Sequence, residues 1–204
     1  MSHRRSKKPK PSDDAITVTK KLAAIAQLET AIQIWFNYGD ALSILALASN
    51  ANDCYDAMAG HVGAPSLYRT WLKSQSQTFQ DRARYVYEFI RHGRKDLKQS
   101  TPYSPRQGEM LIVDSIDCHN RLFGEITPLM SAYGLRLMFE NTDAAVSAQH
   151  ASLFAKASNV YKFAERPRPD FLQAVLKIAA ERIASGTLGK PEIFGALPFG
   201  TGLT

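Results

Sequence analysis

The chain of 204 residues is 45% hydrophobic and 22% charged, a composition typical of a globular protein with one full core and unlike that of a wholly disordered chain. Cys54 and Cys118 lie far apart and form no CxxC pair, so neither a disulfide framework nor a cysteine-based zinc site is indicated. This cysteine usage fits a reducing compartment, and we predict a cytoplasmic protein.

Most of the net charge of +6 comes from the N-terminal stretch MSHRRSKKPKPS. That stretch holds five basic residues and no acidic one, so a charge of only +1 remains for the rest of the chain. A basic stretch punctuated by proline is typical of a disordered tail that can contact phosphates. We therefore predict a disordered basic tail over residues 1–12, a helical domain over 13–186, and an irregular C-terminal tail rich in glycine and proline over 187–204.

No transmembrane segment is predicted. The longest apolar run, ALSILALA at 41–48, is far shorter than the roughly 20 residues that a bilayer-spanning helix needs. The residues PKPSDD stand where a secretory signal would have its apolar segment. The sequence thus predicts no contact with a membrane.

Apolar residues recur at spacings of three and four along nearly the whole chain, which predicts an all-α fold, a compact antiparallel bundle of about six to eight helices. In chain order, the predicted helices span about 17–38, 41–58, 66–92 and 105–123, and further helices begin at Thr127-Pro128, at Asp143 and at Asp170, the last ending before Gly186. Gly39 is expected to close the first helix in a left-handed conformation, and Asp40 and Ser104 are expected to cap the helices that follow them. The predicted core includes Leu22, Ile25, Trp35, Ile44, Leu45, Tyr87, Ile90, Leu111 and Ile116.

The segment EFIRHGRKD at 88–96 places an arginine-histidine pair in a basic stretch. On a helical wheel over 79–95, the apolar residues share one side, and Arg84, Glu88, Arg91, His92 and Lys95 share the other. One interpretation is a solvated helix end, in which Glu88 pairs with the arginines on either side of it. The other is a phosphate-binding element, because arginine offers a forked donor and histidine can exchange a proton near neutral pH.

The segment DSIDCH at 114–119 is the best candidate for a second element of such a site. Asp114, Asp117 and Cys118 are expected to be neighbours on one helix face, where they are either solvated polar residues or a group able to orient His92. A metal site is not predicted, because Cys118 and His119 diverge by about 100 degrees around the helix and no HExxH spacing occurs. Glycine-rich phosphate loops and the GxSxG pattern are also absent from the sequence, and we predict no cofactor.

Three stretches together, TAIQIWFNYGDALSILALASNA at 30–51, EFIRHGRKD at 88–96 and LIVDSID at 111–117, resemble a group of uncharacterised bacterial all-helical proteins related to the HEPN superfamily. The resemblance implies a helical bundle, usually dimeric, that binds RNA or nucleotides. Some members of the superfamily cleave RNA without a metal, through an arginine and a histidine four to six residues later. This chain departs from that spacing, because seven residues separate Arg84 from His92 and Arg91 is adjacent to it.

The resemblance also implies roles for individual residues. His92 would act as general acid or base on a ribose 2′-hydroxyl, and Arg84 or Arg91 would stabilise charge on the phosphorus-centred transition state. The residues predicted to bind the ligand are Arg94, Lys95 and Asp114. The alternative from a different class is a non-catalytic interaction module that forms a homodimer through apolar helix faces. A concave pocket joining Arg91, His92 and Asp114 would favour the first function, and an exposed, separated set would favour the second.

Overall fold

The computed structural model describes residues 17–91, 100–140 and 165–186. Within these residues every regular element of more than one turn is an α-helix, and there is no strand. The helices are α1 (Lys20–Phe36), α2 (Ala41–His61), α3 (Leu67–Lys73), α4 (Gln77–Arg91), α5 (Arg106–Phe123), α6 (Pro128–Glu140) and α8 (Arg168–Ala184). The all-α prediction is confirmed for this part of the chain, while the helix predicted from Asp143 and both predicted tails lie outside it.

None of the described helices combines the length and the apolar character that crossing a membrane requires.

The first two helices are joined by the short connection 37–40. As predicted, Asp40 caps α2, its carboxylate accepting a hydrogen bond from the backbone N–H of Ser43 at 2.7 Å. The left-handed residue at the end of α1 is Tyr38, with φ 53°, so the prediction that Gly39 takes this conformation is wrong. Glycine at 39 meets a need for space instead, because a Cβ there would lie 2.6 Å from Cγ2 of Ile34.

The single helix predicted over 66–92 is in fact two helices, α3 and α4. The run SQS at 74–76 separates them, and the hydroxyl of Ser74 donates to the carbonyl of Trp71 at 2.7 Å. Serine side chains that bond to nearby backbone groups compete with helix continuation, which explains why the helical pattern breaks here. The chain therefore changes direction inside a segment, 66–92, that the apolar periodicity predicts to be one helix.

Two other helix starts differ slightly from the prediction. At α5, Ser104 gives no side-chain cap, and its carbonyl instead accepts a hydrogen bond from the N–H of Gln107 at 3.0 Å. Helix α8 begins at Arg168 rather than Asp170, because prolines at 167 and 169 are tolerated at a helix start, where the first N–H groups have no partner within the helix. Both helices end where expected, before Gly124 and Gly186, which have positive φ.

The hydrophobic core forms where α1, α2, α5 and α6 meet. The predicted core residues Ile25, Trp35, Ile44, Leu45 and Leu111 are buried there. The prediction was too generous for Leu22, Tyr87, Ile90 and Ile116, which are only partly buried. Ile90 and Ile116 pack against the edge of the core, whereas Tyr87 turns its hydroxyl to the polar side chains of α2.

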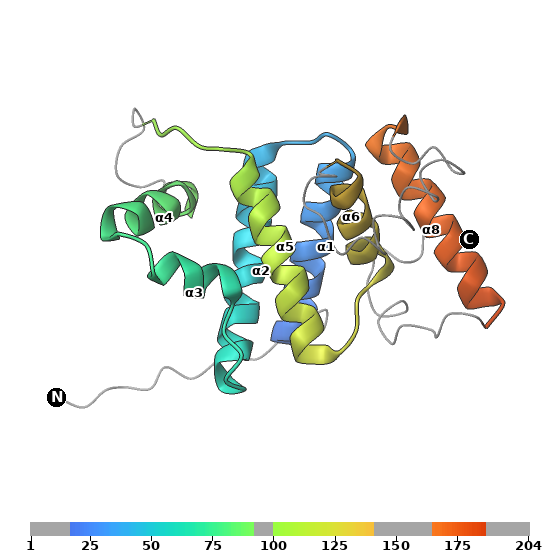
Figure 1. The fold of residues 1–204 in the computed structure, drawn as a ribbon, viewed down its shortest axis with the longest axis horizontal. Helices are drawn as coiled ribbons and strands as arrows, with labels where there is room; N and C mark the ends of the chain where they lie inside the picture. Colours follow the sequence, from blue (N-terminus) through green and yellow to red (C-terminus); the bar gives the residue numbers. More distant parts are fainter. Residues whose placement is uncertain (1–16, 92–99, 141–164, 187–204) are drawn as a thin grey trace.

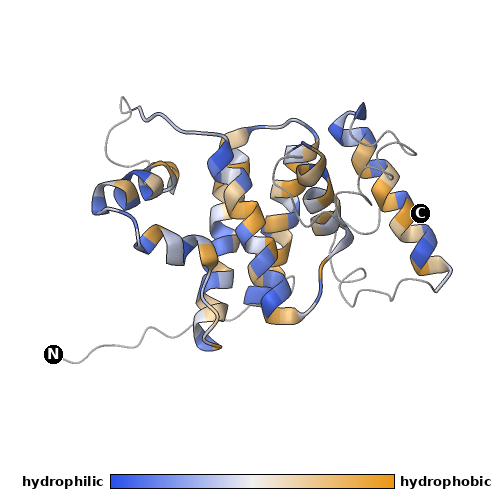
Figure 2. Ribbon diagram, viewed as in Figure 1, coloured by the Kyte–Doolittle hydropathy of each residue, from blue (hydrophilic) through white to orange (hydrophobic). Residues whose placement is uncertain are grey.

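Helix α2 lies at the centre of the arrangement (Figure 1), with α3 and α4 on one side and α1, α6 and α8 on the other. Hydrophobic residues follow α1, α5 and α6 in the middle of the molecule, whereas α4 carries many hydrophilic ones (Figure 2). Helices α2 and α5 run parallel, since Gly108 lies against Leu45 and His119 lies against Tyr55. Residues 100–105 lead into α5 at the level where α2 begins (Figure 1).

Helix α5 approaches α2 closely at Gly108, and this contact gives a first prediction. A Cβ at this position would lie 3.0 Å from Cγ2 of Ile44 and 3.3 Å from the backbone nitrogen of Leu45. Gly134 in α6 is the matched control, since nothing lies within 4 Å of its Cβ position. Gly134→Ala should raise the free energy of unfolding by about 0.5–1 kcal/mol through helix propensity, whereas Gly108→Ala should lower it. Urea denaturation measures both, and equal gains would contradict the close approach.

Candidate functional site

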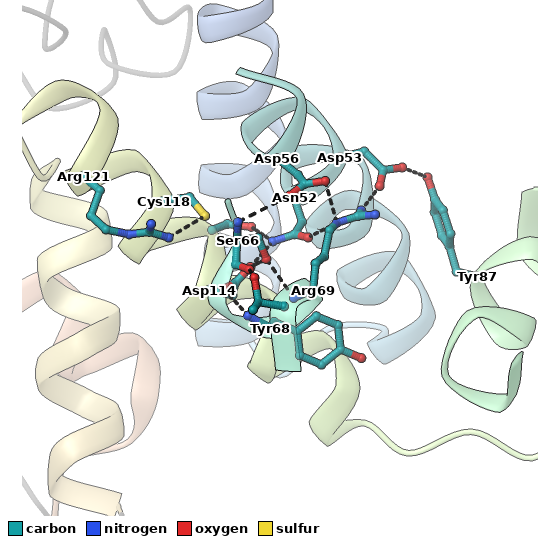
Figure 3. A network of polar contacts seen from close by, with 12 residues as sticks. Asn52, Asp53, Asp56, Ser66, Tyr68, Arg69, Tyr87, Asp114, Cys118 and Arg121 are labelled. Carbon is teal, nitrogen blue, oxygen red and sulfur yellow. Dashed lines mark hydrogen bonds and ion pairs between the residues drawn. The ribbon is translucent and has the colours of Figure 1, made fainter. Parts of the chain in front are cut away.

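A buried carboxylate on α5 fixes one side of the candidate site. Asp114 is 6% exposed, and it accepts hydrogen bonds from Nδ2 of Asn52 at 2.6 Å and from Oγ of Ser66 at 2.6 Å. Its other oxygen accepts the backbone N–H of Tyr68 at 2.9 Å. These three donors come from α2 and from the start of α3, so this carboxylate joins three elements in one network (Figure 3).

Arg69, one residue further along α3, extends the network toward the surface. Its Nε donates to Oδ1 of Asn52 at 3.1 Å and lies 3.5 Å from Oδ2 of Asp56, and its guanidinium pairs with Asp53. Asp53 also accepts the hydroxyl of Tyr87 from α4 at 2.9 Å. Arg69 is therefore held by two aspartates, and its single positive charge offsets one of their two negative charges (Figure 3).

A cavity of about 370 Å³ opens beside this network, between α2, α3, α4 and α5. A volume of this order is near the lower end for small-molecule sites. Its apolar walls come from Leu45, Leu72, Ala83 and Leu111, and its aromatic ones from Tyr68 and Tyr87. The polar lining consists of Ser49, Asn52, Asp53, Asp56, Arg69, Lys73, Arg84, Glu88 and Gln107.

Two of the three cations at the cavity are not neutralised. Arg69 is paired with aspartates, but Lys73 and Arg84 form neither an ion pair nor a side-chain hydrogen bond within the part of the chain that the structure describes. Both are exposed, one at the end of α3 and the other on α4. The third carboxylate of the lining, Glu88, has an interaction of its own. The cavity mouth therefore offers two free positive charges to a ligand.

One side chain of the lining carries a buried polar atom without a partner. Among the described residues, the side-chain carbonyl oxygen of Gln107 accepts no hydrogen bond, and it is enclosed. Gln107 lies one helical turn before Leu111 on α5, and both residues line the cavity. The oxygen itself is closed off from the cavity as well as from solvent, so it is a cost of packing and not a contact offered to a ligand.

The structure places the sequence-predicted residues in different settings. Arg84 lines the cavity and is brought near Arg69 and Tyr87. Asp114 does not line it and is instead enclosed beneath it by its three donors. Arg91 is the last residue of α4, and its side chain is not among those that the structure describes. His92, Arg94 and Lys95 also lie outside the described residues, so their roles stay predictions.

Sequence reasoning missed most of the residues that form the cavity. The signal was present on α2, where Ser49, Asn52, Asp53 and Asp56 recur at spacings of three and four and so form one polar stripe. The sequence analysis predicted the site at the basic segment 88–96 instead of at this stripe. Arg69 carried no comparable signal, because its importance comes from its contacts with side chains of α2.

The neighbouring groups Asp114, Asp117 and Cys118 lie within 4.8 Å of one another, as their spacing on one helix face predicted. Each is already engaged in another way. Asp117 pairs with Arg121 at 2.8 Å, and the carboxylate of Asp114 is saturated by protein donors. Burial raises the pKa of the Cys118 thiol to about 12, which opposes the thiolate that a metal ion would bind. These contacts favour a structural role for the group.

A second polar pair is enclosed in the core on the far side of Cys118. The hydroxyl of Tyr55 lies 3.0 Å from Nδ1 of His119, while Nε2 of that ring has no hydrogen-bond partner among the residues that the structure describes. Burial lowers the pKa of His119 to about 4, so the ring is neutral at pH 7. An enclosed, neutral imidazole of this kind is not placed to exchange a proton with a ligand in the cavity.

No protein-family model matches the chain, and neither a curated protein nor a solved structure matches it. The HEPN resemblance thus stays a prediction, and the functional argument rests on the residues of the cavity.

The buried position of Asp114 yields a second prediction. Asp114→Ala should lower the free energy of unfolding by about 3 kcal/mol, because three donors from α2 and α3 lose their acceptor in an enclosed site. Asp117→Ala is the matched control on the same helix, and it should cost less than about 0.5 kcal/mol because it removes only a surface pair with Arg121. Thermal and urea unfolding test both. Similar losses in the two variants would contradict the central role of Asp114.

Proposed function

We propose that the protein binds the phosphate of a nucleotide or of RNA in the cavity between α2, α3, α4 and α5. The observation that carries this proposal is the pair of unneutralised cations, Lys73 and Arg84, at the mouth of a cavity with apolar and aromatic walls. Arginine and lysine are the side chains that bind phosphate most often, arginine as a fork and lysine as a point charge.

The arrangement of the other charges supports an anion at this place. A carboxylate near a phosphate would repel it, but Asp53 and Asp56 are held by Arg69. Arg69 offsets one of these two negative charges. The lining as a whole holds three acidic and three basic side chains, so what favours an anion is that Lys73 and Arg84 stand outside the ion pairs of the described residues. The aromatic rings of Tyr68 and Tyr87 add flat apolar surface on which a base can pack.

Weak metal-independent ribonuclease activity is the finer form of this proposal. Arg84 would stabilise charge on the reacting phosphate, since its guanidinium lies at the cavity, and His92 would supply the proton transfer. The position of Arg84 supports its part in this mechanism. The cavity lining that the structure describes holds no histidine or cysteine, so proton transfer would depend on His92.

The alternative, a non-catalytic interaction module that dimerises, is favoured by one different observation. Trp71 and Phe79 are 43% and 44% exposed, and their rings meet edge to face with centroids 5.6 Å apart. Leu67, also exposed, lies one turn before Trp71 on the same short helix. Exposed aromatic clusters of this kind are typical of protein contacts. If this protein binds no phosphate ligand, the interaction module becomes the favoured function.

Phosphate binding is tested by replacing the two free cations. Lys73→Ala and Arg84→Ala should each weaken the binding of adenosine monophosphate about five- to tenfold, because each removes a charge-assisted contact to the phosphate. Arg82→Ala is the matched control: Arg82 is an exposed arginine of α4 that does not line the cavity, and it should bind as the wild type does. Isothermal titration calorimetry in low salt measures the affinities.

The basic segment at 1–12 is the same in every variant of this comparison, so any contribution from it cancels. Melting temperatures should be unchanged, because both side chains are exposed. Equal affinities for the wild type and both variants would overturn the assignment of the cavity as the phosphate site.

Ribonuclease activity is tested separately at His92. His92→Ala should abolish cleavage of a single-stranded RNA at neutral pH while leaving the affinity for a mononucleotide within about twofold, because the proposed role of this side chain is proton transfer. Cleavage is followed on a labelled oligonucleotide in the presence of a chelator. His61→Ala is the control, since His61 is an exposed histidine at the end of α2 and away from the cavity lining. Cleavage that survives in the His92 variant would contradict the assigned role, and a wild type without cleavage would leave binding as the function.

A further inference from the structure

Two exposed aromatic side chains meet on the surface formed by α3 and α4. Trp71 and Phe79 are 43% and 44% exposed, and their ring planes cross at 86° with the centroids 5.6 Å apart. We call this pair the aromatic corner. A flat ring that stacks on one member of the corner meets the other edge to face, and both arrangements are favourable between aromatic rings. The corner therefore fits a flat aromatic group of a ligand.

Tyr68 connects the aromatic corner to the cavity. The centroid of its ring lies 5.8 Å from that of Trp71, and Tyr68 is itself one of the residues that line the cavity. Tyr68 and Trp71 are three residues apart on α3, a spacing that makes side chains neighbours on a helix surface. Aromatic surface thus continues from the cavity wall to the exposed corner.

A ligand that extends from the cavity onto the corner carries negative charge and more than one flat ring. The negative charge is favoured by Lys73 and Arg84, which line the cavity and stand outside the ion pairs of the described residues. A nucleic acid strand repeats both groups, with a phosphate about every 3.4 Å along a stacked strand. In a duplex the bases are stacked on one another, so a single strand is the form that offers a base to an exposed ring.

We propose that the aromatic corner is a stacking site for the base next to the nucleotide in the cavity, and that the protein binds a single-stranded nucleic acid in preference to a free mononucleotide. This inference rests on the proposed phosphate site and names its class of ligand. Stacking on an aromatic side chain tolerates any base, because every base has a flat π-face. The corner therefore adds affinity without sequence preference.

The experiment uses two ligands that differ only in the stacked base. One is a 5′-phosphorylated dinucleotide of adenine, and the other is the same dinucleotide without its second base. The full-length wild type should bind the intact dinucleotide about tenfold more tightly, because only this ligand can stack on the corner. The two ligands carry the same charge, so any binding to the basic segment at 1–12 affects both equally. Isothermal titration calorimetry measures the two affinities.

Variants locate the stacked base. Trp71→Ala should abolish the tenfold difference between the two dinucleotides, whereas Trp71→Phe should retain most of it, because a phenyl ring still offers a flat face. Tyr85→Ala is the matched control and should retain the full difference. Tyr85 is an aromatic residue of α4 with 42% exposure, but its ring lies beside that of Phe89 and it does not line the cavity.

Tryptophan fluorescence of the wild type gives a second readout that needs no variant. The chain has two tryptophans, and Trp35 is only 3% exposed, so Trp71 is the one that a ligand can contact. A base stacked on the indole ring should quench its emission. The intact dinucleotide should therefore quench the fluorescence more strongly than the dinucleotide without its second base.

Each other outcome overturns the inference in a recognisable way. Equal affinities of the wild type for the two dinucleotides, with binding still dependent on Lys73 and Arg84, would refute stacking at the corner and leave the phosphate site standing. A difference that persists in Trp71→Ala would place the stacked base elsewhere. Absence of binding to both dinucleotides and to adenosine monophosphate would refute the phosphate site itself. If the wild type does not distinguish the dinucleotides and Trp71→Ala changes the oligomeric state in analytical ultracentrifugation, the corner is a protein contact instead.

Discussion

The hydrogen bonds to the carboxylate of Asp114 determine where the cavity can form. A buried carboxylate is costly unless it is paired or fully hydrogen-bonded, and here Asn52, Ser66 and Tyr68 supply the donors. Because Ser66 and Tyr68 stand at the start of α3, satisfying Asp114 fixes where this short helix leaves the α2–α5 pair. A helix of this length gains little stability alone, so its position depends on such anchors. Arg69 follows directly and is thereby aimed at α2.

The charges around the cavity follow from that placement. Once α3 is held, Arg69 meets Asp53 and Asp56 and offsets one of their two negative charges. The hydroxyl of Tyr87 on α4 then donates a hydrogen bond to Asp53. The three cations therefore have different roles. Arg69 holds α3 against α2, while Lys73 and Arg84 form no ion pair with the described residues. A fixed wall beside free charges needs little reorganisation when an anion binds.

Local sequence signals predicted most of the described helices but not the cavity. The cap at Asp40 and the apolar stripe containing Ile44 and Leu45 depend on neighbouring residues, so periodicity was sufficient to find them. The break between α3 and α4 was missed because apolar spacing continues across it. The parallel course of α2 and α5 was missed because it depends on what that break does to the chain direction. Asp114 was singled out from the sequence, but its burial is a tertiary property that no local pattern contains.

Binding and cleavage make different demands on this fold. The proposed binding of a phosphate and a flat ring rests on described residues alone, since the cations and the apolar and aromatic walls of the cavity are among them. Cleavage needs in addition a group that gains and loses a proton near pH 7. His119 does not meet that need, because burial keeps its ring neutral and enclosed in the core. His92 follows α4 in the sequence and lies outside the described residues, so its part in cleavage stays a proposal that the His92→Ala variant tests.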